Sequence, residues 1–383
     1  MRLMFLTSSL AYGGAEHHAI TLANRLAERG HECHTGWVKP ESSQLSRLRL
    51  STDGSVFCLD AAHYLDLRAL RRLAAVLARV RPAVLVAANP YALMYASLAR
   101  RISGERVPLV VVYHSTRSPG VKEQAQLAAY RPCMWAAEGA VFVCEYQRRY
   151  CLRRGLRSRR NTVIPNGVDV ERYRDAATPA ERRSLRAALG YTDADYVLGV
   201  AGGLRPEKNQ AQLLEAAARL RQRGLPVKTL FIGDGATRAA LEARAEALGL
   251  AAHVTITGFQ EDIRPYITAC DVICVCSLTE ALSLAAIEAM AMSRPLVHSQ
   301  VGGAGELIDP GHNGLLFPAR NTDALVECLL LLADGATRSM LGRAARQTIE
   351  SKFSEARMVD RYEELLMEVS QCAHRMDGYV ARV

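Results

Sequence analysis

Short apolar runs alternate with amphipathic stretches along the whole chain. A run rich in β-branched or apolar residues predicts a strand, and apolar residues that recur every three or four positions predict a helix. In the first half the strand-like runs are 3–7, 83–88, 108–113, 140–143 and 162–164, and helix-like stretches cover 15–29 and 66–79. In the second half strands are predicted at 196–201, 229–232, 254–257, 272–275 and 295–298, and helical structure from about 321 to 368. This alternation is typical of parallel sheets covered by crossover helices.

The length of the chain indicates two such α/β layers, because 383 residues exceed what one compact domain usually accommodates. Between the halves, Ile164–Asp169 ends a strand in Pro-Asn-Gly turn chemistry, and a charged stretch follows. We therefore predict an N-terminal domain at 1–172, a linker region at 173–192 and a C-terminal domain at 193–352. The last stretch, 353–383, is predicted as a helix and tail that pack across the junction.

The net charge of +9 hides a difference between the two halves. Residues 1–190 hold 29 basic and 15 acidic side chains, whereas residues 191–383 hold 19 and 24. The densest basic run includes Arg148, Arg149, Arg153 and Arg154. Such a run suits anionic lipid headgroups or a phosphorylated acceptor, and a solvated helix end is the structural alternative. Nucleic acid is not expected as a partner, because no nucleic-acid recognition motif accompanies the arginines.

The apolar segments are too short for a membrane span or a signal peptide. None reaches the roughly 18 residues of a spanning helix, and the first apolar run, Leu3–Leu6, is far shorter than a signal-peptide core. From the sequence we therefore expect a cytoplasmic protein, with peripheral contact at the inner face of the membrane as a further possibility. The ten cysteines show no C-x-x-C pair, so reduced thiols are expected.

The residues with the strongest chemical meaning follow the predicted strand at 272–275. Glu280 and Glu288 lie on either side of Ser283, which is predicted to cap a helix that ends near Met292. Open α/β sheets bind ligands at the carboxyl ends of their strands, and a helix N-terminus there suits a diphosphate. Glu288 is placed to accept both cis hydroxyls of a ribose. The alternative is a solvated helix face that carries two unrelated glutamates.

A second group follows the first strand of the second half. The stretch 202–209 reads Gly-Gly-Leu-Arg-Pro-Glu-Lys-Asn, so small residues permit close approach of a ligand beside two cations. Arg205 and Lys208 suit a leaving diphosphate. Taken alone, the same stretch is also an ordinary strand-to-helix turn with surface charges.

The order and spacing of these motifs resemble the retaining, two-domain glycosyltransferases of the GT-B type, specifically family 4. The resemblance covers nearly the whole chain and rests on the two groups above together with Gly13-Gly14-Ala15-Glu16, Pro165–Asp169, Gly233-Asp234-Gly235, Gly258-Phe259, Gly302-Gly303 and Asn313-Gly314-Leu315. It implies an α/β fold with two Rossmann-like domains that face a central cleft. It also implies that the C-terminal helix crosses back to the N-terminal domain.

The resemblance assigns roles to individual residues. It implies that Glu288 binds the donor ribose, that Glu280 contacts the transferred sugar, and that Arg205 and Lys208 neutralise the departing diphosphate. His114 matches a histidine of the family that lies near the sugar and the acceptor. Further donor-binding residues implied by the resemblance are Gly13, Gly14, Gly203, Gly258, Phe259, Ala281, Leu282 and Ser283. Many members carry an aromatic or glycine-rich run where this chain has Ala281–Leu284, so the donor-sugar pocket differs here.

These roles imply transfer of a sugar, a hexose in the first instance, with retention of anomeric configuration. The expected donor is a nucleotide diphosphate sugar, with a UDP-sugar favoured over a GDP-sugar, and the expected acceptor is a cell-envelope glycan or glycolipid such as lipopolysaccharide core. No cofactor and no metal are expected, because Arg205 and Lys208 supply the positive charge. A nucleotide-sugar epimerase of the same fold and a non-catalytic sugar-nucleotide-binding protein are the alternatives.

Overall fold

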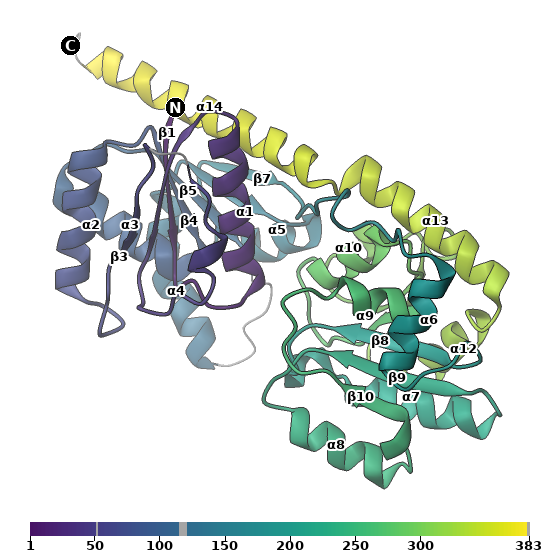
Figure 1. The fold of residues 1–383 in the computed structure, drawn as a ribbon. Coiled ribbons are helices and arrows are strands. Elements are labelled where there is room, and N and C mark those ends of the chain that lie inside the picture. The colour runs from purple at the N-terminus through teal and green to yellow at the C-terminus, as the bar shows by residue number, and fades with distance from the viewer. Residues whose placement is uncertain (51–52, 115–120, 381–383) are drawn as a thin grey trace. The chain divides into compact units, whose positions relative to one another are not determined.

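The computed structural model describes residues 1–50, 53–114 and 121–380. The chain forms two compact units (Figure 1). Unit 1 comprises Met1–Asn166 and Arg357–Val383, and unit 2 comprises Gly167–Ala356. Each unit is an α/β layer built on its own parallel sheet, which confirms the predicted fold class.

Unit 1 is built on a parallel sheet. Among its described residues, seven strands pair in the order β3-β2-β1-β4-β5-β6-β7. The strands are β1 (Arg2–Thr7), β2 (Glu32–Trp37), β3 (Val56–Cys58), β4 (Val84–Ala88), β5 (Leu109–Tyr113), β6 (Gly139–Phe142) and β7 (Arg160–Val163). Strands β4 and β5 are buried along their whole length, which explains their unbroken apolar sequence. The strand order reverses between β1 and β4, and open sheets bind ligands at the carboxyl ends of strands beside such a reversal.

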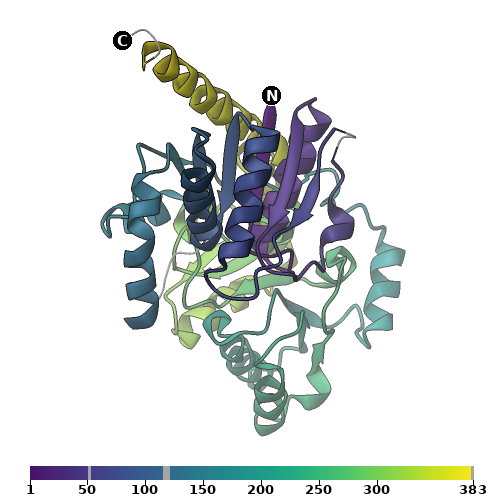
Figure 2. The same cartoon turned by 90° about the vertical axis from the view of Figure 1, so that its left-hand side faces the viewer.

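Helices cover both faces of this sheet. They are α1 (Gly14–Glu28), the short η1 (Leu45–Arg47), α2 (Leu67–Val80), α3 (Asn89–Ser103), α4 (Val121–Trp135), α5 (Glu145–Leu152) and α14 (Glu355–Val380). In Figure 2 the layer of α2 and α3 faces the viewer, and its apolar side chains, such as Leu73 and Leu77, belong to the core on that face. Helix α2 begins where Asp66 Oδ1 accepts the N–H groups of Arg68 (2.8 Å) and Ala69 (3.2 Å).

The opposite face of the sheet is covered by α1 and α14. Tyr362 of α14 and Leu22 of α1 belong to one apolar cluster with the strands, and α14 is the yellow helix beside α1 in Figure 1. Arg29 at the end of α1 forms ion pairs of 2.6 Å with both Asp360 and Glu363 of α14. The predicted return of the C-terminal helix to the N-terminal domain is therefore confirmed.

Unit 2 repeats the architecture with a second parallel sheet. Across the fully described stretch 167–356, six strands pair in the order β10-β9-β8-β11-β12-β13. They are β8 (Tyr196–Ala201), β9 (Val227–Ile232), β10 (Val254–Ile256), β11 (Val272–Val275), β12 (Leu296–Ser299) and β13 (Leu315–Phe317). The strand order reverses between β8 and β11. The carboxyl ends of these two strands therefore mark the place where this sheet is expected to bind a ligand.

The helices of unit 2 also lie on both faces of its sheet. They are α6 (Pro179–Ala188), η2 (Pro206–Lys208), α7 (Ala211–Gln222), α8 (Arg238–Ala247), η3 (Ala251–His253), α9 (Arg264–Ala269), α10 (Leu284–Ala291), α11 (Ala304–Leu307), α12 (Thr322–Leu331) and α13 (Gly335–Lys352). Helices α7, α8 and α12 share one apolar core with the strands. The helical stretch predicted from 321 is divided by Asp334, whose side chain caps α13 by accepting the N–H of Thr337 (2.7 Å).

The segment 173–192, predicted as a linker region, carries α6 and is fixed to unit 2. Asp271 Oδ2, just before β11, pairs with Arg186 (2.6 Å), and Oδ1 pairs with Arg182 (2.9 Å). The same carboxylate accepts the N–H of Val197 in β8 (2.8 Å). A buried carboxylate with two guanidinium partners and a backbone donor is fully satisfied, so it ties the segment to the sheet.

Three strands escaped the sequence analysis, whereas the ten predicted strands lie within two residues of their observed bounds. Strand β2 carries polar residues that are satisfied inside the fold: His34 is buried, with Nδ1 2.8 Å from Ser55 Oγ and Nε2 3.1 Å from Glu32 Oε1. Because the sequence analysis identified strands by apolar runs, it did not detect this polar one. Strands β3 and β13 have only three residues each and were not distinguished from the segments around them, whereas the equally short β10 was.

Candidate functional site

The carboxylate of Glu280 lies in the segment between β11 and α10, at the carboxyl edge of the second sheet. Its Oε1 accepts a hydrogen bond from Ser277 Oγ (2.8 Å) and forms an ion pair with Lys208 Nζ. The Glu280 side chain is only 12% exposed, and that of Lys208 is 30% exposed. The structure thus brings together two of the predicted catalytic residues, one from each side of the strand reversal.

Lys208 lies in the turn η2 that follows β8. Leu278 N–H donates to the carbonyl of Glu207 (2.8 Å), so the segment after β11 is tied directly to this turn. Asn209 closes the turn in the left-handed region at φ 50°. Arg205, in contrast, has a side chain that is 60% exposed, and its carboxylate neighbour Glu207 is 4.0 Å away. Lys208 is therefore held in place, and Arg205 extends toward solvent.

Helix α10 begins directly after the Glu280 segment. Ser283 Oγ accepts the N–H of Ala286 (3.3 Å), which confirms the predicted cap. The first turn of α10 directs its N–H groups toward the carboxyl edge of the sheet, as an anion-binding helix terminus requires. A backbone hydrogen bond from the N–H of Gly303 to the carbonyl of Ala281 (2.7 Å) fixes the segment before α10. Leu282 is buried, so its side chain anchors this segment in the core.

Glu288 lies one turn further along α10 and is partly buried. Tyr173 Oη donates a hydrogen bond to Glu288 Oε1 (2.9 Å). Loss of hydration raises the pKa of Glu288 to about 7, although the Tyr173 hydrogen bond and the charge of Arg172 act in the opposite direction. A carboxyl group with this pKa is poised between its neutral and charged forms near neutral pH.

Tyr173 was not found by the sequence analysis. The turn after the Pro-Asn-Gly motif positions it, because Asp169 Oδ1 accepts the N–H groups of Glu171 (3.1 Å) and Arg172 (2.9 Å). The Arg346 guanidinium then donates to the Tyr173 carbonyl (2.7 Å). Its only mark in the sequence is that an aromatic residue follows Asp169 by four positions. The sequence analysis assigned that position to the start of the linker region and gave it no role.

The unusual pKa of Glu288 predicts a pH-dependent stability. Because the folded-state pKa is raised from 4.5 to about 7, the folded chain binds more protons than the unfolded chain between these values. The free energy of unfolding should therefore fall as pH rises through this window and level off above it. In Glu288→Gln this decline should be smaller by about 1–3 kcal/mol. Urea unfolding at a series of pH values measures this decline, and Glu246→Gln, at an exposed glutamate, is the control. If the unfolding free energy of Glu288→Gln changed with pH as that of the wild type does, the raised pKa would not belong to Glu288.

The remaining predicted donor residues lie along the same edge of the second sheet. Gly203 follows β8, and Gly258 follows β10 with φ 72°. Phe259 is 54% exposed. In the sheet order, β9 lies between β10 and β8, so Gly258 and Phe259 start two strands away from Lys208.

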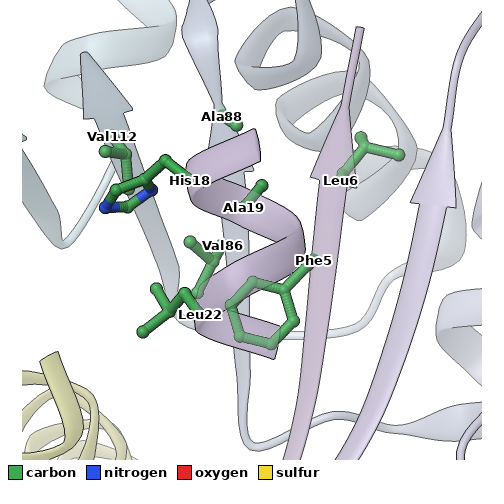
Figure 3. A pocket seen from close by; sticks show the side chains of 8 residues that line it. All are labelled: Phe5, Leu6, His18, Ala19, Leu22, Val86, Ala88 and Val112. Atoms are coloured by element: carbon green, nitrogen blue, oxygen red, sulfur yellow. The ribbon is translucent and has the colours of Figure 1, made fainter. Parts of the chain in front are cut away.

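The predicted site residues of unit 1 gather at the carboxyl edge of the first sheet. Gly13 and Gly14 follow β1 and open α1, and His114 follows β5. His18 of α1 lies edge-on to His114, with ring centroids 4.8 Å apart. Burial lowers the pKa of His114 to about 4, so its imidazole is neutral at physiological pH. Figure 3 shows His18 projecting from α1 toward the strand that carries Val112.

His18 is the residue of this group that the sequence analysis missed. It is buried and also contacts Tyr362 of α14, with ring centroids 5.3 Å apart. Burial and the neighbouring His114 lower the pKa of His18. Among the described residues, neither His18 Nε2 nor His114 Nε2 has a hydrogen-bond partner. A neutral imidazole with an unpaired nitrogen is suited to a hydrogen bond with a ligand.

The arginine run lies on α5 and the turn after it. Arg148 pairs with Glu145 (2.9 Å), and the Arg154 guanidinium stacks on the Tyr150 ring, 3.7 Å from its centroid. Arg149 and Arg153 are exposed. Arg148 and Arg154 therefore have local partners, and Arg149 and Arg153 are the cations available to an anion.

Two observations bear on metals and membranes. Within the residues that the structure describes, no group of three or more His, Cys, Asp or Glu side chains is arranged to hold a metal ion. An Asp-x-Asp triplet that the sequence analysis overlooked, Asp193-Ala194-Asp195, precedes β8 at the opposite edge from Lys208, and Asp195 Oδ2 accepts the Thr192 N–H (2.7 Å). Over the same described ranges, no helix combines the length and apolarity needed to cross a bilayer.

Comparison with known proteins places each half of the chain with glycosyltransferases. The profile of Glycosyltransferase Family 4 matches residues 12–172, and that of Glycosyl transferases group 1 matches residues 181–348. Alpha-D-kanosaminyltransferase of Streptomyces kanamyceticus is 31% identical over 73% of this chain and 74% of its own length. The putative glycosyltransferase EpsD of Bacillus subtilis is 32% identical over 61% of this chain, and the match spans only 60% of EpsD.

A third relative and a solved structure agree with these matches. An Escherichia coli enzyme, UDP-Gal:alpha-D-GlcNAc-diphosphoundecaprenol alpha-1,3-galactosyltransferase, is 26% identical over 54% of this chain and 54% of its own length. The crystal structure of Anabaena Alr3699/HepE in complex with UDP-glucose superposes with a TM-score of 0.84 at 24% identity, covering 96% of this chain and 100% of that one. At this identity the likeness establishes a shared fold.

Proposed function

The chain belongs to the family 4 glycosyltransferases, and from this premise we propose that it transfers a sugar from a UDP-sugar to a cell-envelope glycan or glycolipid. The observation that carries the proposal is the ion pair of Glu280 with Lys208 at the strand reversal of unit 2, directly before α10, the helix that carries Glu288. Hexosyl transfer with retention of configuration is part of the proposal.

The donor is proposed to bind with its diphosphate at the α10 N-terminus and Lys208. The helix dipole and the ammonium group both favour negative charge there. Glu288 then accepts the two ribose hydroxyls, each a charge-assisted hydrogen bond worth on the order of 1.5 to 3 kcal/mol. Tyr173 orients this carboxylate from the other side through its 2.9 Å hydrogen bond. Binding of a ribose favours the ionised form, so UDP affinity should rise as pH increases through the pKa of Glu288.

In the proposed mechanism, the protein accelerates the reaction by stabilising the negative charge that develops on the leaving diphosphate. Cleavage of the anomeric bond builds negative charge on the diphosphate, and Lys208 and Arg205 stabilise it without a requirement for a metal ion. The diphosphate competes with Glu280 for Lys208, which frees the Glu280 carboxylate for hydroxyls of the transferred sugar. His114 is proposed to contact the sugar and the acceptor as a neutral imidazole, since its pKa of about 4 keeps it uncharged.

The proposed acceptor class follows from the charge of unit 1 and from the relatives. The Escherichia coli relative is named for transfer onto a diphosphoundecaprenol-linked sugar, and a lipopolysaccharide outer core galactosyltransferase, WaaB, shares the fold. Arg149 and Arg153 are exposed cations that suit an anionic acceptor or a membrane surface. We propose an envelope acceptor such as lipopolysaccharide core, reached from the cytoplasmic side of the membrane.

The proposal is tested by saturation-transfer NMR with a panel of UDP- and GDP-sugars in buffer that contains a metal chelator. One UDP-sugar is expected to bind selectively. Glu288→Ala should weaken that binding by about a hundredfold or more, because two hydrogen bonds to ribose are lost. The matched control is Glu246→Ala, an exposed glutamate on α8 in the same unit.

The outcomes separate the alternatives. If no nucleotide sugar binds, or if Glu288→Ala binds like Glu246→Ala, the donor-site assignment fails. Selective GDP-sugar binding would replace the proposed donor. Release of an isomerised sugar or donor without any acceptor would favour the epimerase, and binding without turnover on any acceptor would favour a non-catalytic role.

A further inference from the structure

Four tyrosines and a lysine form a cluster in unit 1 that none of the preceding functional assignments uses. We call Tyr64, Tyr91, Tyr95, Tyr130 and Lys39 the tyrosine platform. The Tyr91 ring lies 5.0 Å from that of Tyr64 and 5.3 Å from that of Tyr95, measured between centroids. Lys39 Nζ lies 5.4 Å from the centroid of Tyr91. Aromatic faces beside a cation are a common means of binding polar ligands with apolar faces.

The platform stands at the same edge of the first sheet as Gly13 and His114. Lys39 follows β2, Tyr64 follows β3, and Tyr91 opens α3 directly after β4. Strands β4 and β5 are neighbours, so Tyr91 and His114 start from adjacent strand ends. In a parallel sheet these carboxyl ends form the ligand-binding edge.

Backbone contacts fix this arrangement. The N–H of Lys39 donates to the carbonyl of Ser8 (3.0 Å), which ties the lysine to the segment after β1. Asn89 turns the chain from β4 into α3 with φ 81°, a left-handed conformation that costs free energy in a residue other than glycine. The strained corner sets the direction in which Tyr91 leaves the sheet.

Hydrogen bonds hold the rings in a defined orientation. The buried Tyr95 hydroxyl accepts the N–H of Asp66 (2.9 Å), two positions after Tyr64. The Tyr64 and Tyr130 hydroxyls are hydrogen-bonded to each other, and Gln126 Nε2 donates to both, at 2.9 Å and 3.2 Å. Such a network orders the exposed Tyr64 ring before a ligand arrives, which reduces the entropic cost of binding.

Two groups of the platform are left unsatisfied by the protein. The Tyr91 hydroxyl is shielded from solvent and has no hydrogen-bond partner among the described residues. Lys39 is exposed, and no carboxylate in the described ranges pairs with its ammonium group. Tyr64 is 50% exposed, so one ring is accessible beside these two groups. The accessible groups, an unpaired cation and an open aromatic ring, suit an anionic ligand with an apolar face.

We propose that the tyrosine platform is an acceptor subsite that binds a pyranose ring bearing an anionic group, either a carboxylate or a phosphate. The inference rests on the proposed glycosyltransferase function. The ring stacks on the exposed Tyr64, and Lys39 binds the anion. The platform thus selects acidic over neutral acceptors at the edge of the sheet that carries His114.

The test uses the full chain without donor and three probes: methyl glucoside, methyl glucuronoside and methyl glucoside 6-phosphate. Affinities are measured by saturation-transfer NMR. At least one anionic probe should bind about tenfold more tightly than the neutral one. Tyr64→Ala should weaken all binding about tenfold, through loss of stacking, and Lys39→Gln should remove only the preference for the anion. The preferred anionic probe tells a carboxylate acceptor from a phosphate acceptor.

Matched controls are Tyr146→Ala, an exposed tyrosine on α5, and Arg79→Gln, an exposed cation on α2. UDP affinity should be unchanged in every variant, since the donor residues lie in unit 2. If UDP binds but Tyr64→Ala and Lys39→Gln bind all probes like wild type, the platform assignment fails and the proposed function stands. If no UDP-sugar binds, the proposed function fails by itself. Tyr64-dependent binding to anionic lipid vesicles, with no saccharide binding, would overturn the subsite in favour of a lipid surface.

Discussion

Lys208→Ala is expected to lower kcat about 10²- to 10³-fold, the usual effect of removing one preorganised group that stabilises a developing negative charge. Lys208 is held at the strand reversal by its ion pair with Glu280, so its ammonium group is already at the place proposed for the diphosphate. Because the charge on the leaving group grows in the transition state, kcat should fall more than the affinity for the donor. The rate of UDP release at a series of donor concentrations, with and without acceptor, measures kcat and the dependence on the donor.

Two variants make this result specific. Lys352→Ala removes an exposed lysine of α13 in the same unit and should leave kcat unchanged. Lys208→Arg keeps the positive charge but changes its shape and reach, so it should recover only part of the lost rate. If Lys208→Ala raised KM at constant kcat, the lysine would contribute to donor binding alone, and its assignment to the leaving group would be wrong.

Gly302→Ala is expected to displace the Glu280 segment and to abolish donor binding. A Cβ at position 302 would lie 1.9 Å from the carbonyl oxygen of Glu280, and the residue has φ 57°. The obstacle is backbone, so a side-chain rotation cannot relieve it. We expect a loss of about 3 kcal/mol or more in the free energy of unfolding, or an equivalent shift of the segment. Thermal unfolding and UDP titration measure the two effects.

Gly305→Ala is the matched control three positions away. A Cβ there meets no atom within 4 Å, and the residue lies in α11, where alanine is favoured over glycine by roughly 0.5–1 kcal/mol. This variant should bind UDP like wild type and unfold at the same or a slightly higher temperature. If the two variants had the same unfolding temperature and the same affinity for UDP, the close approach of Gly302 to Glu280 would not matter for donor binding.

Much of the fold was predictable because apolar runs in fully buried parallel strands are long and unbroken, as in β5 and β8. The cap at Ser283 was predictable because capping depends on residues three positions apart in the chain. The pairing of Glu280 with Lys208 could be inferred only from the expected topology, which places the ends of β8 and β11 side by side. Rules that act over a few neighbouring residues therefore predict the strands and the helix cap, whereas the Glu280–Lys208 ion pair follows only from the topology of the sheet.

The residues that were missed depend on contacts between distant positions. Tyr173 acquires its meaning from Glu288, 115 positions later in the chain. His34 looks like an exposed polar residue until Ser55 and Glu32 satisfy it inside the sheet. The tyrosine platform draws on Tyr64 and Tyr130, which lie 66 positions apart. No periodic pattern links such pairs, because side-chain hydrogen bonds across a fold leave no spacing rule in the sequence.

The return of α14 to unit 1 sets an order on the folding of a newly made chain. A ribosome completes all of unit 2 before it reaches Tyr362 and Leu366, which cover a face of the first sheet. Unit 2 is one continuous segment and can close its core as soon as it emerges. Unit 1, although its strands and α1 are made first, keeps the part of this face that α14 covers open to water until the last helix is released. The N-terminal half is thus the last to mature.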